Sequence, residues 1–268
     1  MKKVFKRLLG ILLLGVVTLS ATACGKDENT IVIAATAAPH AEILEFAEDL
    51  VEAKGYKLDI KIFSDYVTPN TATEAGDVDA NFFQHTPYLN SFNEENDTHL
   101  VSVGAVHYEP LGLYKGSKSS LEAIADGDKI LVPNDTTNEA RALLLLEEAG
   151  LIDVRDDAGL TATKADIVSN PKNLDIIEMN AELIAASRVD GALAVINGNY
   201  ALEAGLRTQD AIQFESSTGL AATTYANILV VKDGNQNNPA ILALIEVLQS
   251  EEVKNFIRET YQGSVIPA

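Results

Sequence analysis

The stretch Ile31-Val32-Ile33-Ala34-Ala35, followed by Pro39 and then by residues 41–53, decides the fold of this chain. Residues 31–35 are a short apolar run, which is typical of a buried β-strand. From Ala41 to Ala53 the apolar residues recur at three- and four-residue spacing, which is typical of an amphipathic helix. A strand followed at once by a helix predicts an α/β fold, in which helices cover the faces of a sheet.

The same alternation continues to the C-terminus. Residues 58–63 alternate polar and apolar side chains, a turn is expected at residues 68–70, and a second alternating run ends at Phe83. Thr86-Pro87 resembles a helix start, with Thr86 as the N-cap and Pro87 at the first helical position. Further strands or extended segments are predicted at residues 100–114, 129–132, 176–178, 192–196 and 226–231, and further helices at residues 136–149, 181–188 and 239 to about 260. The repeated order predicts mostly parallel sheets covered by helices.

A chain of 268 residues exceeds one small domain, so we expect two α/β lobes. The stretches near residues 109–113 and 219–225 are the expected crossovers, because neither looks like a helix with caps. Lobe 1 is then expected to comprise residues 30–111 and 224–268, and lobe 2 residues 112–223. Two lobes joined by two crossover strands form a clamshell, a plan typical of exported solute-binding proteins.

Composition excludes several classes of partner. The chain has 20 Lys and Arg against 39 Asp and Glu, for a formal net charge of −19. Nucleic acid is therefore not expected as a partner, because its binding draws on basic side chains that neutralise phosphates. A single cysteine excludes an intrachain disulfide, and the histidines His40, His85, His99 and His107 form no paired-ligand motif. We therefore expect no metal site and no cofactor.

The N-terminus has the pattern of a secretory signal peptide over residues 1–23. A basic start is followed by an apolar run from Leu8 to Val17, which is shorter than the ~20 residues of a membrane-spanning helix. Small residues then precede Cys24, an arrangement that resembles the lipobox of bacterial lipoproteins, in which the cysteine is acylated. Residues 24–29 are then a lipidated tether that holds the protein at the extracytoplasmic face of the cell membrane. The alternative is an ordinary cleavage after Ala23 that leaves a free thiol.

The helix predicted from Thr136 carries the best candidate for an anion site. Thr136 and Glu139 fit a capping box, and Asn138 and Arg141 share one face of the helix. An arginine near a helix N-terminus is unfavourable by ~0.3 to 1 kcal/mol unless an anion joins it. A ligand carboxylate held bidentately by Arg141 is one such anion, and a surface acidic side chain is the alternative.

Aromatic residues gather in residues 81–88 of a chain that is only 6% aromatic. Strand alternation places Phe82 and Phe83 on opposite faces, so at least one of them leaves the core or reaches a cleft. His85 follows directly and is expected to be a capped or solvated loop residue, or else a ligand contact. Together with Tyr66, these side chains fit a slot for an apolar or thioether group.

The run Asp79-Ala80-Asn81-Phe82-Phe83-Gln84-His85-Thr86-Pro87-Tyr88-Leu89 resembles the signature of the NlpA lipoprotein family, the methionine-binding lipoproteins of methionine ABC importers. Other segments that agree are residues 65–70, 132–138 with Arg141, 194–197, 225–227 and 263–268. The resemblance extends over essentially the whole chain. It implies a clamshell of the type II periplasmic-binding-protein fold, with no enzymatic activity.

The resemblance also implies a ligand, partners and a site. The ligand is L-methionine, and the partners are a membrane permease and its ATPase. Tyr66, Phe83 and His85 surround the methionine side chain, and Arg141 holds the α-carboxylate. The remaining polar groups of the amino acid are held by Asn138, Asn197 and Asn227.

Glu109 is a further candidate from the residues themselves, because a buried ammonium group needs a partner. The alternative for Glu109 is a surface-facing acid beside Pro110.

Other functions stay open at this stage. The family pattern has different residues at Thr137, Ala140 and Asn199, which leaves open whether the ligand is methionine itself or a methionine-containing dipeptide. D-methionine and another small apolar amino acid, bound by the same fold, are further alternatives. An enzyme, with His85 beside Tyr88 as its weak candidate site, and a lipoprotein that carries a metal ion are the remaining alternatives.

Overall fold

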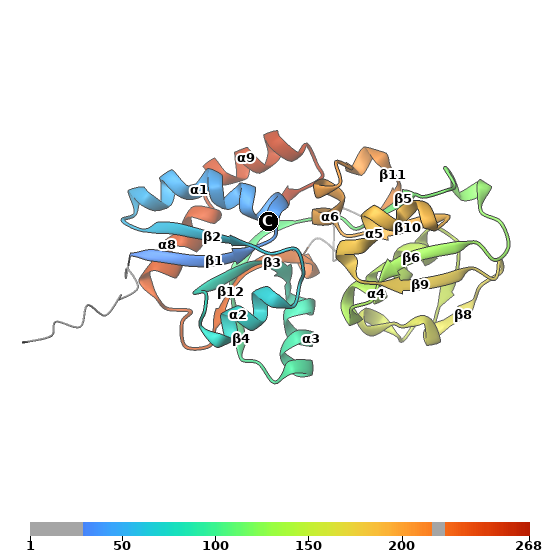
Figure 1. Cartoon of the computed structure of the whole chain (residues 1–268), viewed down its shortest axis with the longest axis horizontal. Helices are drawn as coiled ribbons and strands as arrows, with labels where there is room; N and C mark the ends of the chain where they lie inside the picture. Colours follow the sequence, from blue (N-terminus) through green and yellow to red (C-terminus); the bar gives the residue numbers. More distant parts are fainter. Residues whose placement is uncertain (1–28, 216–222) are drawn as a thin grey trace, which may run out of the picture.

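The computed structural model describes residues 29–215 and 223–268. Two separate β-sheets lie side by side, each with its own helices (Figure 1). We call the six-stranded sheet with its helices lobe 1 and the five-stranded sheet with its helices lobe 2. The expected signal peptide and Cys24 lie outside the described residues.

Lobe 1 is built on a mixed sheet whose helices cover both faces. In spatial order its strands are β13 (Ile266–Pro267), β4 (Leu100–Tyr108), β12 (Ala226–Lys232), β3 (Ala80–His85), β1 (Thr30–Ala35) and β2 (Lys57–Ile62). Its helices are η1 (Ala37–Ala41), α1 (Glu42–Ala53), α2 (Thr68–Ala75), α3 (Thr86–Asn96), α8 (Pro239–Leu248) and α9 (Glu251–Tyr261). Helices α1, α8 and α9 lie on one face, and α2 and α3 lie on the other (Figure 1).

The core of lobe 1 follows from the pattern of its first strand and helix. Ile31 and Ile33 on β1 pack with Leu44 on α1 and Leu244 on α8, and all four are buried. Each such side chain contributes about 1.5–3 kcal/mol when it leaves water. Phe82 on β3 joins this core. The opposite alternation leaves Phe83 free to face elsewhere.

Lobe 2 is smaller and also mixed. In spatial order its strands are β11 (Ala211–Phe214), β5 (Gly112–Lys115), β10 (Leu193–Ile196), β6 (Lys129–Pro133) and β9 (Asp175–Met179), with a separate pair β7 (Asp153–Val154) and β8 (Ile167–Ser169). Its helices are α4 (Thr136–Glu148), α5 (Ala181–Ser187) and α6 (Gly198–Glu203), and its short 3₁₀ turns are η2 (Leu121–Ala123), η3 (Gly159–Thr161), η4 (Lys164–Asp166), η5 (Arg188–Asp190) and η6 (Thr208–Asp210).

The chain passes between the sheets twice. It leaves lobe 1 after β4 and enters lobe 2 at β5, and it returns between β11 and β12. The returning strand β12 runs antiparallel between β3 and β4. The expectation of mostly parallel sheets is therefore wrong: β12 and β13 in lobe 1, and β5 and β11 in lobe 2, pair antiparallel with their neighbours.

Three local expectations also differ from the structure. The turn expected at residues 68–70 is the start of helix α2, with Pro69 in its first turn. The N-cap of α3 is His85 and not Thr86, because the His85 ring accepts the Tyr88 N–H at 3.2 Å. The single C-terminal helix is two helices, since Ser250 caps a new helix, α9.

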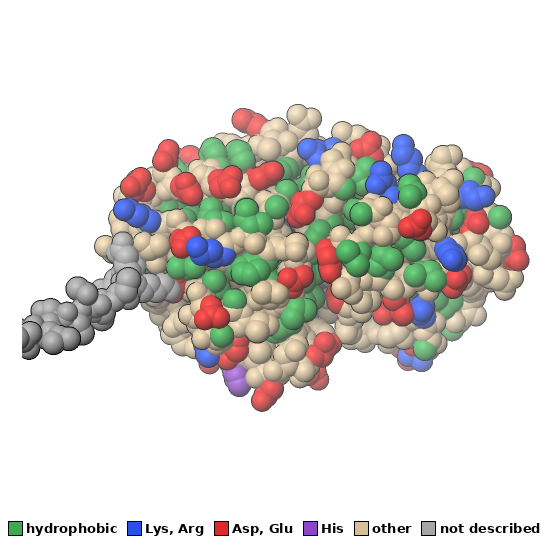
Figure 2. Space-filling view, in the orientation of Figure 1, with side chains coloured by type: hydrophobic (Ala, Val, Ile, Leu, Met, Phe, Trp, Pro, Cys, Tyr) green, Lys and Arg blue, Asp and Glu red, His purple; other side chains and the backbone are tan. Residues whose placement is uncertain are grey.

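Acidic side chains are spread over both lobes on the face shown in Figure 2, and basic side chains are fewer. Within the part of the chain that the structure describes, no helix is both long enough and apolar enough to cross a membrane.

Gly116 tests the packing of lobe 2. A Cβ at Gly116 would lie 2.3 Å from the carbonyl oxygen of Arg188 and 2.4 Å from that of Gly191, and neither backbone atom can rotate away. Gly116→Ala should lower the free energy of unfolding by about 3 kcal/mol, the upper part of the range for overpacking.

Gly104→Ala is the matched control, because its Cβ meets only the side chains of Gln249 and Ile245, at 3.0 Å. We expect a loss of about 1 kcal/mol there, since those side chains can shift. Melting temperatures measured by calorimetry compare the two variants. Equal melting temperatures would contradict the steric assignment.

Candidate functional site

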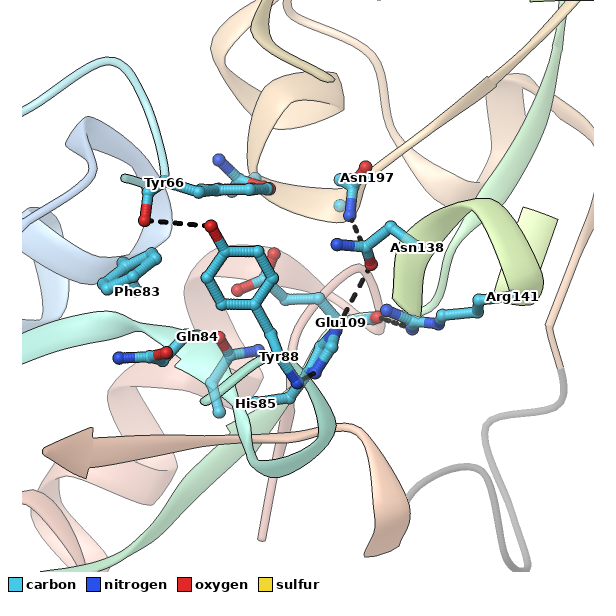
Figure 3. A pocket seen from close by; sticks show the side chains of 12 residues that line it. Tyr66, Phe83, Gln84, His85, Tyr88, Glu109, Asn138, Arg141 and Asn197 are labelled. Atoms are coloured by element: carbon cyan, nitrogen blue, oxygen red, sulfur yellow. Dashed lines mark hydrogen bonds between the residues drawn. The ribbon is translucent and has the colours of Figure 1, made fainter. Parts of the chain in front are cut away.

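A pocket lies between the lobes, where β3 ends and β12 begins in lobe 1 and α4 and α6 begin in lobe 2 (Figure 3). It encloses about 340 Å³ not filled by atoms. It is lined by every ligand-binding residue predicted from the sequence: Tyr66, Phe83, His85, Asn138, Arg141, Asn197 and Asn227. Glu109, Gln84, Tyr88, Gly198 and Asn199 complete the lining. The structure therefore brings the predicted set together, while the role of each residue remains a prediction.

Strand register explains why distant residues of lobe 1 meet here. Asn227 on β12 pairs with His85 on β3 at one side and with His107 on β4 at the other. His40 of η1 adds a side-chain contact, with its Nε2 lying 3.1 Å from Asn227 Oδ1. Residues from four separate segments of the sequence thus meet at one end of the sheet.

One wall of the pocket is aromatic. The ring centroid of Tyr66 lies 5.7 Å from that of Phe83 and 5.6 Å from that of Tyr88, and Phe83 and Tyr88 are 5.9 Å apart. The Tyr88 hydroxyl donates to the Tyr66 carbonyl at 3.1 Å, which fixes the ring. Sequence reasoning missed Tyr88 as a lining residue, although it lies in the run that carries the family signature.

The start of α4 differs from the expected capping box. Asp135 is the N-cap, and its carboxylate accepts the Asn138 N–H at 3.0 Å. Glu139 instead turns away from the helix start and accepts the Lys164 N–H. The Asn138 side chain is therefore held by Asp135 through its Nδ2 atom, and its Oδ1 faces the pocket.

Arg141 is paired within the protein. Its Nε donates to Glu215 Oε1 at 2.7 Å and its Nη2 donates to Glu215 Oε2 at 2.6 Å. Both partners are buried, so the alternative that Arg141 pairs with an acidic side chain at the surface is wrong. The two parallel hydrogen bonds that we expected for a ligand carboxylate are made to Glu215. Nη2 also donates to the Glu109 carbonyl, and the guanidinium lies 4.3 Å from the Tyr225 ring. Nη1 makes no hydrogen bond within the described part of the chain.

Glu109 is buried, only 5% exposed, and lines the pocket, so the alternative of a surface-facing acid is wrong. Its Oε1 accepts from His107 Nε2 at 2.7 Å and lies 3.3 Å from His40 Nε2. Burial lowers the pKa of His40 to about 4 and that of His107 to about 3, and it raises the pKa of Glu109. Both imidazoles are therefore neutral donors near pH 7.

Two amide atoms of the lining have no hydrogen-bond partner among the described residues. These are Asn197 Oδ1, an acceptor, and Asn199 Nδ2, a donor, and both are buried. Buried polar atoms are nearly always paired in proteins, so such atoms in a pocket mark places for a ligand's polar groups. Sequence reasoning predicted Asn197 but missed Asn199, which it noted only as a departure from the family pattern.

The two lobes also touch directly across the cleft. Asn138 Oδ1 accepts from His85 Nε2 of lobe 1 at 3.2 Å and from Asn197 Nδ2 of lobe 2 at 3.0 Å (Figure 3). Farther out, the Tyr200 hydroxyl donates to the Ser64 carbonyl at 3.0 Å, and Tyr200 stacks on Tyr66. These contacts hold the lobes together around the pocket.

Metal-binding potential is confined to a single cluster in the described residues. His40, His107 and Glu109 place ligand atoms within 4.8 Å of one another. The expectation that the histidines are scattered is therefore wrong for these two. His107 Nε2 already donates to Glu109 Oε1, and His40 Nε2 donates to Asn227 Oδ1 and lies 3.3 Å from the same Glu109 oxygen.

Comparison with known proteins identifies the family. Residues 31–268 match the family model described as NlpA lipoprotein. The methionine-binding lipoprotein MetQ of Bacillus subtilis is 42% identical over 278 residues, covering 100% of this chain and 99% of the relative.

Two solved structures share the fold. A lipoprotein from Ruminococcus gnavus is 54% identical, with a TM-score of 0.89, over 90% of this chain and 99% of that chain. A nutrient-binding protein from Burkholderia cenocepacia, bound to methionine, is 39% identical, with a TM-score of 0.84, over 89% of this chain and 99% of that chain. The two-lobe α/β fold is thus that of periplasmic substrate-binding proteins, as the sequence predicted. The chain belongs to the NlpA lipoprotein family, whose members are membrane lipoproteins that bind substrates and are not enzymes.

Proposed function

We propose that this protein captures L-methionine outside the cytoplasm and delivers it to the permease of an ABC importer. The observation that carries the proposal is the pocket itself, which joins an aromatic wall to buried polar atoms that lack partners. An amino acid with an unbranched apolar side chain has matching parts. The relative from B. subtilis is named for methionine binding, and the B. cenocepacia structure holds methionine, which supports the same ligand here.

Each predicted residue has a role in this proposal. Tyr66, Phe83 and His85 surround the thioether, because sulfur packs favourably against ring edges. Arg141 receives the α-carboxylate through Nη1, the guanidinium nitrogen that Glu215 leaves open. The remaining polar groups of the ligand bind Asn138, Asn197 and Asn227.

A methionine-containing dipeptide is an alternative ligand, with two residues in place of one. D-methionine and other small apolar amino acids remain alternatives of similar size.

Binding couples to delivery through the lobes. A ligand that contacts both lobes stabilises the closed form in proportion to its preference for that form. The closed protein, held at the membrane by acylated Cys24, then docks on the permease, and a separate ATPase drives import.

Melting of the mature protein from Cys24 onward, refolded to remove ligand, tests the proposal. A ligand present at 100 times its Kd stabilises the folded state by ~2.7 kcal/mol, which raises the melting temperature by several degrees. We expect this rise with L-methionine. A larger rise in melting temperature with D-methionine, norleucine or a methionine dipeptide would identify that compound as the ligand in place of L-methionine. No rise with any of these compounds would contradict the proposal.

Asn227→Ala should abolish measurable methionine binding. The substitution removes a pocket amide, which also accepts from His40 Nε2 at 3.1 Å. Isothermal titration compares it with Asn237→Ala, an exposed asparagine of the loop before α8. Near-wild-type affinity in Asn227→Ala would remove this residue from the site.

Arg141→Ala should weaken folding as well as binding. It leaves the Glu215 carboxylate buried without its cation, a change that typically costs about 3–5 kcal/mol. The double variant Arg141→Ala with Glu215→Gln should recover part of the lost melting temperature without recovering methionine binding. A single variant that melts like the wild type would show that the pair is not needed for folding.

A further inference from the structure

We infer that His107, packed against His40, is a positioning residue that holds the Glu109 carboxylate as the acceptor for a ligand ammonium group, so that the site selects molecules with a free amino group. The inference rests on the proposed function and adds a rule of selection to it. Neither histidine lines the pocket, whereas Glu109 does.

The two rings converge on one oxygen atom. Nε2 of His107 lies 2.7 Å from Glu109 Oε1, and Nε2 of His40 lies 3.3 Å from the same atom. Asn227 Oδ1 can only accept, so the proton of the neutral His40 ring is on Nε2, and the Thr36 hydroxyl 2.7 Å from Nδ1 is then the donor. Phe82 packs edge-on against both rings, with centroids 4.7 Å from His40 and 5.3 Å from His107. The His107 N–H is therefore directed at Glu109, whereas the His40 N–H donates to Asn227 Oδ1 and lies beside the same Glu109 oxygen.

Backbone atoms hold Glu109 from the other lobe. The Asn199 backbone N–H favours the charged form of the Glu109 carboxyl and so lowers its pKa. A Cβ at Gly198 would lie 2.6 Å from Glu109 Cβ and 2.9 Å from its Oε2, so only glycine lets the start of α6 approach this closely. A carboxylate offers about four acceptor positions, so the hydrogen bond from His107 Nε2 leaves room on Glu109 for a ligand donor.

The charges around Glu109 leave it without a cation. His40 and His107 are neutral, and Arg141, which also lowers the pKa of Glu109, is hydrogen-bonded to the Glu215 carboxylate and to the Glu109 backbone carbonyl. The other titratable side chain near Glu109 is Glu203, which is itself a carboxyl and so supplies no cation. A buried carboxylate without a counter-charge is costly, and burial raises its pKa accordingly. A ligand ammonium supplies the missing charge, and the unpaired Asn197 Oδ1 offers it a second acceptor in the same pocket.

Titration calorimetry on the mature protein measures this selection with pairs of ligands that differ only in the amino group. Methionine is compared with 4-(methylthio)butanoate, and norleucine with hexanoate. The wild type should prefer the amino acid by about 100-fold, the size expected for a buried charge pair. Glu109→Gln should narrow this preference to about tenfold or less, because the amide carries no charge.

Substitutions at His107 separate positioning from folding. His107→Met fills the space without a donor and should narrow the same ratio, whereas His107→Gln keeps an N–H donor and should restore it. His99→Met, at an exposed histidine, is the matched control. Melting temperatures without ligand are recorded for every variant, since a merely structural role would lower them and leave the ratio unchanged.

An unchanged ratio in Glu109→Gln or His107→Met would overturn the inference. A zinc-dependent rise in the melting temperature of the wild type that His107→Met abolishes would also overturn it, because the cluster would then be a metal site. If norleucine binds and methionine does not, with the ratio narrowing as expected, the proposed ligand fails and the inference stands. If no amino acid binds, both fail.

Discussion

The buried ion pair between Arg141 and Glu215 is the contact on which the rest of the site depends. Glu215 also accepts from the Tyr108 hydroxyl and from the Leu111 N–H, each at 3.0 Å, so this residue after β11 is bonded to the other passage of the chain between the lobes. Removing one partner of such a pair leaves a buried charge, which is far more damaging than replacing both. The pair thus fixes the guanidinium at the hinge through Nε and Nη2, before any ligand arrives.

The charged groups of the pocket favour a ligand that carries an ammonium group. Arg141 is neutralised by Glu215, the neighbouring histidines are uncharged, and Glu109 adds one carboxylate. The acidic residues that give the chain its charge of −19 lie largely on the surface, where water screens them (Figure 2). The overall acidity of the chain therefore has little bearing on which ligand the pocket accepts.

Local patterns predicted much of this molecule and failed where contacts are long-range. Periodicity placed the β1–α1 unit and the alternation of Phe82 and Phe83 correctly, because both depend on neighbouring residues. Neighbouring residues gave no indication that β12 returns antiparallel to β3. They also gave no indication of the partner of Arg141, which lies 74 residues away in the sequence. His40 and His107 looked scattered for the same reason. The pocket residues were reached through the family resemblance, which carries three-dimensional information that spacing alone does not.

Asn138 shows how binding and closure become one event. Its Nδ2 is anchored to Asp135, while its Oδ1 accepts from His85 in one lobe and from Asn197 in the other. His85 in turn accepts the Tyr88 N–H, which ties the aromatic wall to the same contact. Opening the lobes breaks the bond between Asn138 and His85, and so separates the aromatic wall from the polar end of the pocket. A ligand with both an apolar side chain and polar groups spans these two parts, whereas a ligand with only one of them gains little from closure.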